Sequence, residues 1–388
     1  MTDRCTRREF LALSGTALSS CVLPPVLARL ERRSANAGHV GQTERHLLYV
    51  AEPGIRNYVE WGGIGVLVYD IADGFRLVRR IATLTTPSGE SPEPIKGICA
   101  SAATGKLYVS TPRRLLCIHL RTDALLWSHT YEAGCDRMSI TPDGATIYLP
   151  SFEGPLWYVV DAATGDEIAR VVTNSGAHNT ICGPSGTHAY LAGLRSPLLR
   201  VADTRSRTVV REVGPFSNVI RPFTIDGAER RCFVNVNELL GFEVGDLQSG
   251  KMLHRVEVPK FTKGPVKRHG CPSHGIAMTP DEREVWVSDG ANSRVHMFDG
   301  TVMPPRYVQS IVLRDQPGWI TLTIDGTLAI PSTGEVIDTR SKQIVAALAD
   351  EAGRPVQSEK LLEVVTDAGT PVRAGDQFAI GGHRERPA

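Results

Sequence analysis

Several short motifs that identify common enzyme classes are absent from this sequence. It has no G-x-S-x-G turn, no P-loop and no G-x-G-x-x-G after a strand-like run, so serine hydrolase, nucleotidase and Rossmann-type functions have no support. Its 8 cysteines form no C-x-x-C pair, which argues against a zinc ribbon, a thioredoxin-like redox site and covalent haem attachment. No contiguous motif names the chemistry of this protein.

Net charge and long apolar runs are lacking as well. The 43 Lys and Arg residues balance 42 Asp and Glu residues, which gives a net charge of +1. No global field therefore attracts nucleic acid or an anionic membrane surface, and any charge selectivity must be local. The apolar stretch Phe10–Ser20 is too short to span a bilayer permanently. We expect no nucleic-acid partner, and membrane contact only through an N-terminal anchor.

The N-terminus resembles a bacterial export signal. Thr6-Arg-Arg-Glu-Phe-Leu-Ala12 places paired arginines before a short apolar region, as in a twin-arginine signal. Leu18-Ser-Ser-Cys21 is similar to a lipobox, in which cleavage precedes Cys21 and that sulfur is lipidated. The alternative is later cleavage, after Ala28 or after Ala35-Asn-Ala37. We expect a signal and lipobox region at 1–28, a tether at 29–45 and one domain at 46–388, located in the periplasm or on a membrane-anchored lipoprotein.

The cysteines of the expected domain fall into two groups. Four of them lie within strand-like runs and are expected to be buried small hydrophobic residues: Cys99, Cys117, Cys182 and Cys232. Cys135 and Cys271 instead precede strand-like runs. We expect these two to be reactive or paired.

A repeated turn identifies the fold class. Ser139-Ile-Thr-Pro-Asp-Gly-Ala-Thr-Ile-Tyr-Leu149 is similar to Ala277–Val287 and to Leu322–Ile330, and a strand–turn–strand repeat at about forty residues indicates a β-propeller. Outer hairpins such as Val160-Asp-Ala-Ala-Thr-Gly-Asp-Glu-Ile168 supply the count. Seven are expected: 66–81, 116–131, 158–172, 199–213, 241–258, 295–312 and 335–348. We predict an all-β, seven-bladed β-propeller.

The first blade begins at its second strand, His46-Leu-Leu-Tyr-Val-Ala51, because no inner strand precedes it. An exposed strand edge of this kind needs a partner. We expect the C-terminal segment to close the ring by supplying the missing inner strand, either from Glu359–Val365 or from Asp376–Ile380.

After the tether, the chain resembles the bacterial YVTN-type seven-bladed propeller proteins, through its T-P-D-G-like turns and V-x-D-x-x-T-G hairpins. The Tyr-Val-Thr-Asn motif itself is replaced by Tyr108-Val-Ser-Thr111 and Trp286-Val-Ser-Asp289. The resemblance implies the fold and an exported protein, and it leaves the activity open.

Alignment of the repeats locates a candidate site. Five residues before the Thr of each turn, at the start of the inner strand, the sequence holds Lys96, Asp136, His178, Gly318 and His274. In one further blade this position is Val219, and Arg221 lies two residues on, on the same face of the strand. We therefore predict a ring of Lys96, Asp136, His178, Arg221 and His274 at one rim of the channel, with Arg137, Asn179, His269 and Trp319 at nearly the same level and Glu60 and Trp61 as a possible cap.

Ordinary structural roles are open for the same residues. His178 and His274 could hydrogen-bond backbone between blades, and Asp136 with Arg137 could form an inter-blade ion pair of little functional value. Arg221, before Pro222, could simply stack in the channel mouth. Trp319 could plug the channel instead of binding a ligand.

Two chemistries suit such a ring. In the first, Arg137 or Arg221 binds a carboxylate or phosphate and Lys96 adds a point charge; if catalysis follows, His178 or His274 would abstract a proton beside the carboxylate, with Arg221 stabilising the enolate. In the second, His178, His274 and His269 bind a divalent metal, with Asp136 as carboxylate.

Two function classes follow from these chemistries. The first is an exported cell-envelope propeller that binds a small anionic ligand or an envelope protein at its channel. The alternative is a lyase or hydrolase that acts on a uronate-like anionic sugar through the channel His and Arg residues, with or without a metal ion. The fold alone favours the binding function.

Overall fold

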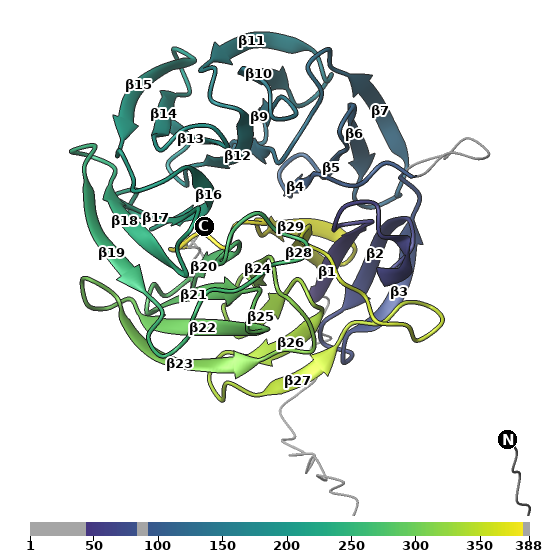
Figure 1. The fold of residues 1–388 in the computed structure, drawn as a ribbon. Coiled ribbons are helices and arrows are strands. Elements are labelled where there is room, and N and C mark those ends of the chain that lie inside the picture. Colours follow the sequence, from purple (N-terminus) through teal and green to yellow (C-terminus); the bar gives the residue numbers. More distant parts are fainter. Residues whose placement is uncertain (1–43, 84–91, 383–388) are drawn as a thin grey trace, which may run out of the picture. The chain divides into compact units, whose positions relative to one another are not determined.

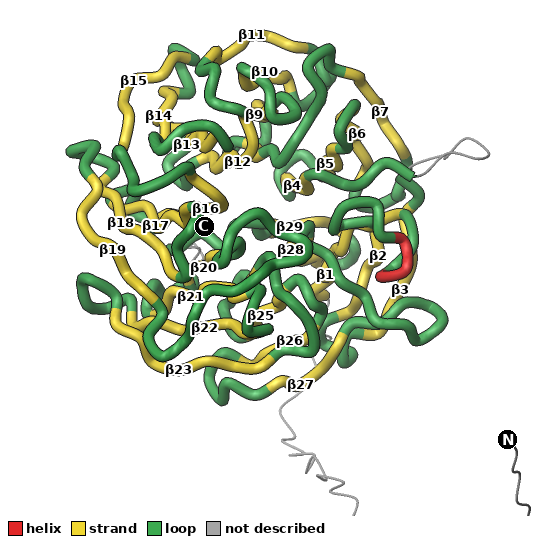
Figure 2. Tube along the Cα trace, viewed as in Figure 1, coloured by secondary structure: helices red, strands yellow, loops and turns green. Residues whose placement is uncertain are grey.

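The computed structural model describes residues 44–83 and 92–382. The twin-arginine-like residues, Cys21 and nearly all of the expected tether lie outside these residues. Within the described residues, no helix is long and apolar enough to cross a membrane. The helix that the structure gives there is a 3₁₀ turn, η1 (Val59–Trp61), drawn red in Figure 2.

Seven antiparallel sheets form the blades of a propeller and surround a common centre (Figure 1). Six of the sheets have four strands each, which follow one another in the sequence from the centre outward. The first three consist of β4 (Gly97–Ser101), β5 (Lys106–Ser110), β6 (Arg114–His119) and β7 (Leu125–Thr130); of β8 (Ser139–Ile140), β9 (Thr146–Pro150), β10 (Leu156–Asp161) and β11 (Glu167–Val172); and of β12 (Ala177–Cys182), β13 (His188–Gly193), β14 (Leu199–Asp203) and β15 (Thr208–Val213). The other three consist of β16 (Ile220–Ile225), β17 (Arg231–Val236), β18 (Gly241–Asp246) and β19 (Met252–Glu257); of β20 (Ile276–Met278), β21 (Glu284–Asp289), β22 (Arg294–Asp299) and β23 (Arg306–Val312); and of β24 (Ile320–Leu322), β25 (Leu328–Pro331), β26 (Glu335–Asp338) and β27 (Ile344–Ala347). The seven predicted outer hairpins are confirmed.

The seventh sheet joins the two ends of the described chain. Its order is β29 (Thr370–Ala374), β28 (Leu361–Asp367), β1 (Glu44–Glu52), β2 (Gly65–Asp70) and β3 (Arg76–Ile81). β28 pairs antiparallel with β1 and places His46 opposite Val365. C-terminal closure of the ring is therefore confirmed, and Glu359–Val365, the first of the two predicted donors, supplies the strand.

The second predicted donor, Asp376–Ile380, has a different role. Its backbone bonds to the ends of inner strands: the amide of Met278 donates to Ala379 O at 3.0 Å, and the Thr224 hydroxyl donates to the same oxygen at 2.8 Å. Phe378 is buried to 1% exposure. The prediction that this segment could be a closing strand is wrong, because it crosses the channel and fills the end where the inner strands finish.

Local turn chemistry explains why the repeated motif folds in this way. In each of the three repeats the threonine hydroxyl donates to the aspartate two residues on, as between Thr141 and Asp143 at 2.5 Å. The same hydroxyl accepts the amide that begins the next strand, here Thr146 at 3.0 Å. Gly144 follows with φ +71°, a left-handed conformation that glycine adopts without strain. Each turn therefore closes with its own residues.

Packing between neighbouring blades forms the core. At the closing interface, Leu48 and Tyr69 of the first blade pack with Ile330 and Val336 of the last. Outer strands are the exposed layer, and β7 buries none of its residues completely. Since each blade covers the face of the next, the ring needs all of its blades to exclude water from these interfaces.

The described cysteines are all buried. Cys99, Cys117, Cys182 and Cys232 are buried, as predicted. Cys135 and Cys271 are buried and free as well, so the expectation that these two are paired is wrong. Burial raises the pKa of Cys271 to about 12 and that of Cys135 further still. Both are therefore protonated thiols of low reactivity at neutral pH.

Candidate functional site

The ring residues lie where the inner strands begin, at the opposite end of these strands from the Ala379 contacts. His178 is the second residue of β12 and Arg221 the second of β16, while Lys96 directly precedes β4 and His274 lies just before β20. All four are partly buried. The alignment of the turns thus predicted correctly that these side chains start the inner strands, and their function stays a prediction.

Asp136 and His178 form a close pair between neighbouring blades. The Asp136 carboxylate accepts a hydrogen bond from His178 Nδ1 at 2.6 Å, and the exposed fractions of the two side chains are 1% and 15%. A carboxylate only accepts, so Nδ1 carries the proton and Nε2 is left as the second functional nitrogen of the ring. Asp136 therefore positions His178 and does not form the ion pair with Arg137 that the sequence suggested.

Arg137 is buried in the channel. Its guanidinium carbon lies 3.6 Å from the centroid of the Trp319 ring, and its Nη2 donates to Glu359 Oε2 at 3.2 Å. Trp319 in turn donates its indole N–H to Gln377 O and packs against Phe378. Trp319 thus separates the charged residues from the C-terminal segment, which fits the plug role better than an open ligand platform.

Two histidines face the same carboxylate. His269 Nδ1 lies 3.1 Å from Glu359 Oε1 and His274 Nδ1 lies 3.9 Å from it. The two imidazoles stack with centroids 4.8 Å apart, and His274 Nδ1 donates to Gly318 O at 2.8 Å. The structure therefore brings His269 and His274 together with Glu359, whereas His178 lies with Asp136.

Gly318 is required for this close approach. A Cβ built there would lie 2.1 Å from Cε1 of His269 and 2.4 Å from Oε1 of Glu359, distances that real Cβ atoms do not adopt. In the alignment of the turns, Gly318 was the position without a functional side chain. Because it has none, the side chains of His269 and Glu359 can lie against its backbone.

Several ionisable groups at this end of the channel have shifted pKa values, Glu359, Lys360 and His274 among them. Burial raises the pKa of Glu359, but Lys360 and His269 outweigh burial and hold it well below the usual range. Burial, assisted by the charge of Arg137, lowers the pKa of Lys360 to about 7. Burial also lowers the pKa of His274 well below its usual value, which keeps this imidazole neutral at physiological pH. Perturbed groups of this kind concentrate at functional sites.

Several polar atoms here have no hydrogen-bond partner among the described residues. They are Arg137 Nη1, His269 Nε2, Glu359 Oε1 and both side-chain amide atoms of Asn179. A buried polar atom without a partner costs about 1–3 kcal/mol. Since such groups are usually satisfied in folded proteins, their gathering at one end of the channel indicates a place for a ligand, an ion or water.

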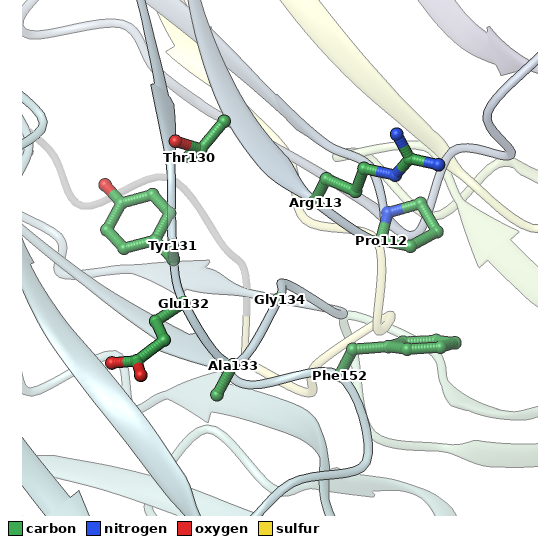
Figure 3. Close-up of a pocket in the computed structure, with 8 residues that line it drawn as sticks. All are labelled: Pro112, Arg113, Thr130, Tyr131, Glu132, Ala133, Gly134 and Phe152. Atoms are coloured by element: carbon green, nitrogen blue, oxygen red, sulfur yellow. The ribbon is translucent and has the colours of Figure 1, made fainter.

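Lys96 and Arg221 lie at the border of this group. Arg221 Nε donates to Asn237 Oδ1 at 2.5 Å, and Lys96 Nζ lies 4.6 Å from the Phe152 ring centroid. Phe152 also borders an open surface depression of about 600 Å³ between Pro112–Arg113 and Thr130–Gly134 (Figure 3). The lining of this depression is mixed, with one Arg and one Glu, and lacks the convergent charges of the channel end. We therefore place the candidate site in the channel.

Trp61, one of the two predicted cap residues, contacts Arg268, and the cap itself stays a prediction. The Arg268 guanidinium lies 4.1 Å from the Trp61 ring centroid and pairs with Asp315 at 2.6 Å. Gln357 N donates to Trp61 O, which fixes this loop beside the segment that leads to Glu359. Glu60 is exposed.

The sequence comparison missed Glu359 and Lys360 as site residues. Lys360 Nζ donates to Glu359 Oε2 at 3.0 Å and to Gly54 O at 2.7 Å. The available signal was the adjacent acid and base that begin Glu359–Val365, the segment predicted as a closing strand. Since inner strands begin at the site, the residues before this strand belonged in the ring as well.

Comparisons with known proteins bear on the fold. No protein-family model matches the chain, and no curated protein matches it significantly. Among solved structures, Kuenenia stuttgartiensis hydrazine synthase is 15% identical over 66% of this chain and 99% of that chain, with a TM-score of 0.44. Dihydro-heme d1 dehydrogenase NirN in complex with DHE is 14% identical over 85% of this chain and 72% of that chain, with a TM-score of 0.58. The likeness to NirN is one of fold.

Proposed function

We propose that this protein is an exported β-propeller of the cell envelope that binds a small anionic ligand where the inner strands begin. The observation that carries the proposal is Arg137. Its guanidinium is fixed by Trp319 on one face and by Glu359 at one nitrogen, while Nη1 has no partner among the residues described. A guanidinium held in place with a free donor is suited to bind a carboxylate or phosphate.

The surrounding donors support an anion over a cationic or apolar ligand. Lys96, Arg221 and His178 lie at the partly exposed border of the site, and Asn179 Nδ2 is buried without a partner in the described part of the chain. Because Arg137 itself is 2% exposed, the group that reaches it must be small. A carboxylate at the end of a larger molecule meets this requirement.

Export is part of the same proposal. The twin-arginine-like residues and the lipobox-like Leu18-Ser-Ser-Cys21 support a periplasmic or membrane-anchored location. The resemblance to YVTN-type propellers agrees with this location. A protein partner in the envelope would use the same face of the ring, with an acidic side chain as its anionic group.

A second candidate, a uronate lyase, is favoured by the Asp136–His178 pair. A buried carboxylate that holds a histidine at 2.6 Å orients the imidazole as a general base. In this reaction Nε2 of His178 would remove the proton beside the ligand carboxylate, Arg221 or Arg137 would stabilise the enolate, and the bond to the leaving oxygen would break as that oxygen takes up a proton.

A thermal-shift screen of the full chain tests the binding function. The probes are uronates, phosphosugars and haem, the last because NirN, which has a similar fold, is a dihydro-heme d1 dehydrogenase. We expect an anion to raise Tm in the wild type, and the double variant His178→Ala/His274→Ala to lose this shift while its own stability stays within about 2 kcal/mol. No shift with any probe would contradict the proposal, and collapse of the variant would show that the histidines are structural.

The same sample tests the lyase. Incubation with uronate-containing oligosaccharides would produce unsaturated sugars that absorb in the ultraviolet. Product formed by the wild type and not by His178→Ala would support the lyase, whereas binding without product would leave the binding function alone.

A further inference from the structure

We propose that His269, His274 and Glu359 bind a divalent metal ion. One nitrogen of each imidazole and one oxygen of the carboxylate all lie within 4.8 Å of one another. A set of two histidines and one carboxylate is a ligand set that zinc and other first-row divalent ions accept, with further positions left for water or a ligand. It differs from the set expected from the sequence, because Glu359 takes the place of Asp136 and His178 lies outside it.

The orientation of Glu359 supports this assignment. Oε2 is held by Arg137 at 3.2 Å and by Lys360 at 3.0 Å, so the carboxylate cannot turn freely. Oε1 faces the two imidazoles and forms no hydrogen bond with any described residue. One oxygen is thus fixed by cations and the other is presented to the histidines, which is the arrangement of a ligand with outer partners.

His274 has a matching outer partner. Its Nδ1 donates to Gly318 O at 2.8 Å, and ligand histidines almost always give their second ring nitrogen to a carbonyl or carboxylate. His269 Nε2 is buried without a partner among the residues that the structure describes. The lack of a Cβ at Gly318 lets His269 and Glu359 approach one backbone position together.

The competing explanation is an ion pair network without a metal. In that case His269 Nδ1, 3.1 Å from Glu359 Oε1, would pair with this oxygen, and the buried Nε2 of His269 would still have no partner among the described residues. Arg137 and Lys360 oppose a bare cation nearby. The same two charges would favour an anion beside the metal, so an anionic ligand could share the site, although metal binding itself does not depend on the anion proposed above.

Metal titration of the chelator-treated full chain tests the site. We expect one equivalent of Zn²⁺ or Co²⁺ to bind, and bound Co²⁺ to give the visible absorption of a site with nitrogen and oxygen ligands. His274→Ala and Glu359→Gln should each weaken binding by more than about 100-fold, because even outer partners of a ligand are worth about 10–100-fold. His178→Ala, an imidazole of the same channel outside the set, and the outer-strand variant His129→Ala should keep the full equivalent.

Three results would overturn this site: no saturable binding by the wild type, unchanged binding in both His274→Ala and Glu359→Gln, or loss of binding in His178→Ala. Circular dichroism of each variant verifies folding, and His269→Ala provides a third ligand variant if Glu359→Gln does not fold. The anion screen repeated with chelator present separates the two proposals, since anion binding without metal would leave the first standing.

Discussion

The two ends of the central channel differ in how their polar groups are satisfied. At the end where the inner strands finish, the C-terminal segment supplies a partner: Ala379 O accepts from the Thr224 hydroxyl and the Met278 amide. At the other end Arg137 Nη1 and Glu359 Oε1 have no hydrogen-bond partner among the described residues, although Oε1 faces His269 Nδ1 at 3.1 Å. Trp319 lies between the two. At one end the chain satisfies the polar groups with its own residues, and at the other end it leaves hydrogen-bond donors and acceptors unsatisfied.

Removal of the closing segment should have the largest effect, because it affects the stability of the whole ring. A chain that ends at residue 355 lacks β28, so β1 loses its ladder partner and one blade interface is exposed. We expect no cooperative thermal transition by circular dichroism. A chain that ends at Gly382 should melt like the full chain, and a sharp native melt of the shorter chain would contradict the closure.

Phe378→Ala should disrupt only the channel end that the C-terminal segment fills. Phe378 is buried against Trp319, and loss of a buried Phe side chain should cost about 3–5 kcal/mol in the free energy of unfolding. Denaturant unfolding measures this cost. Phe152→Ala, at 40% exposure, is the matched control and should change stability by less than about 0.5 kcal/mol. Equal effects of the two changes would show that the C-terminal segment does not pack as described.

Gly318→Ala should disrupt the other channel end, which holds the candidate site. The added Cβ would displace His269 and Glu359, so metal and anion binding should both be lost, with a stability cost of about 1–3 kcal/mol from overpacking. Calorimetric titration of folded protein measures the binding. Gly264→Ala, whose Cβ would contact only Ala291 at 3.2 Å, should bind normally. Retained binding in Gly318→Ala would refute the described cluster.

The smallest effect concerns the turns, which belong to neither end. Hydrogen bonds from the Thr141 hydroxyl and the Ala145 amide lower the pKa of Asp143, and Asp325 has a lowered pKa in the equivalent turn, where bonds from Thr327 and Thr323 outweigh burial. A carboxyl with a lowered folded pKa stabilises the fold above its unfolded pKa of about 3.9 and loses this effect as the pH falls. Tm should therefore decline below about pH 4, and less steeply in Asp143→Asn/Asp325→Asn. An equal decline in both proteins would contradict this role.

The fold was predictable because its information is local. Each Thr-x-Asp turn and each outer hairpin closes with neighbouring residues, so the blades could be counted from the sequence. The choice between two C-terminal donors was not local, since it depends on which segment fits the edge of β1. The burial of Cys135 and Cys271 was missed for the same reason, because a position before a strand says nothing of what the adjacent blade covers.

The position of the site could be predicted from the sequence, but which of its side chains contact one another could not. The alignment of turns located the residues that begin the inner strands, including His178 and His274. It could not show that His178 pairs with Asp136 or that His269 lies against Glu359, because these distances are set by the approach of separate blades. Lys360 and Glu359 were missed since their blade is completed by strands from opposite ends of the chain.

Calorimetric titration of the anion identified by the screen tests the central claim most directly, in wild type, in Arg221→Gln and in Arg170→Gln. Arg221 lies at the start of an inner strand, whereas Arg170 lies on the exposed outer strand β11 and pairs with Glu167. We predict that Arg221→Gln weakens binding at least about tenfold, or about 1.4 kcal/mol, while Arg170→Gln binds like the wild type. Equal affinities in all three proteins would contradict a ligand site at this end of the channel.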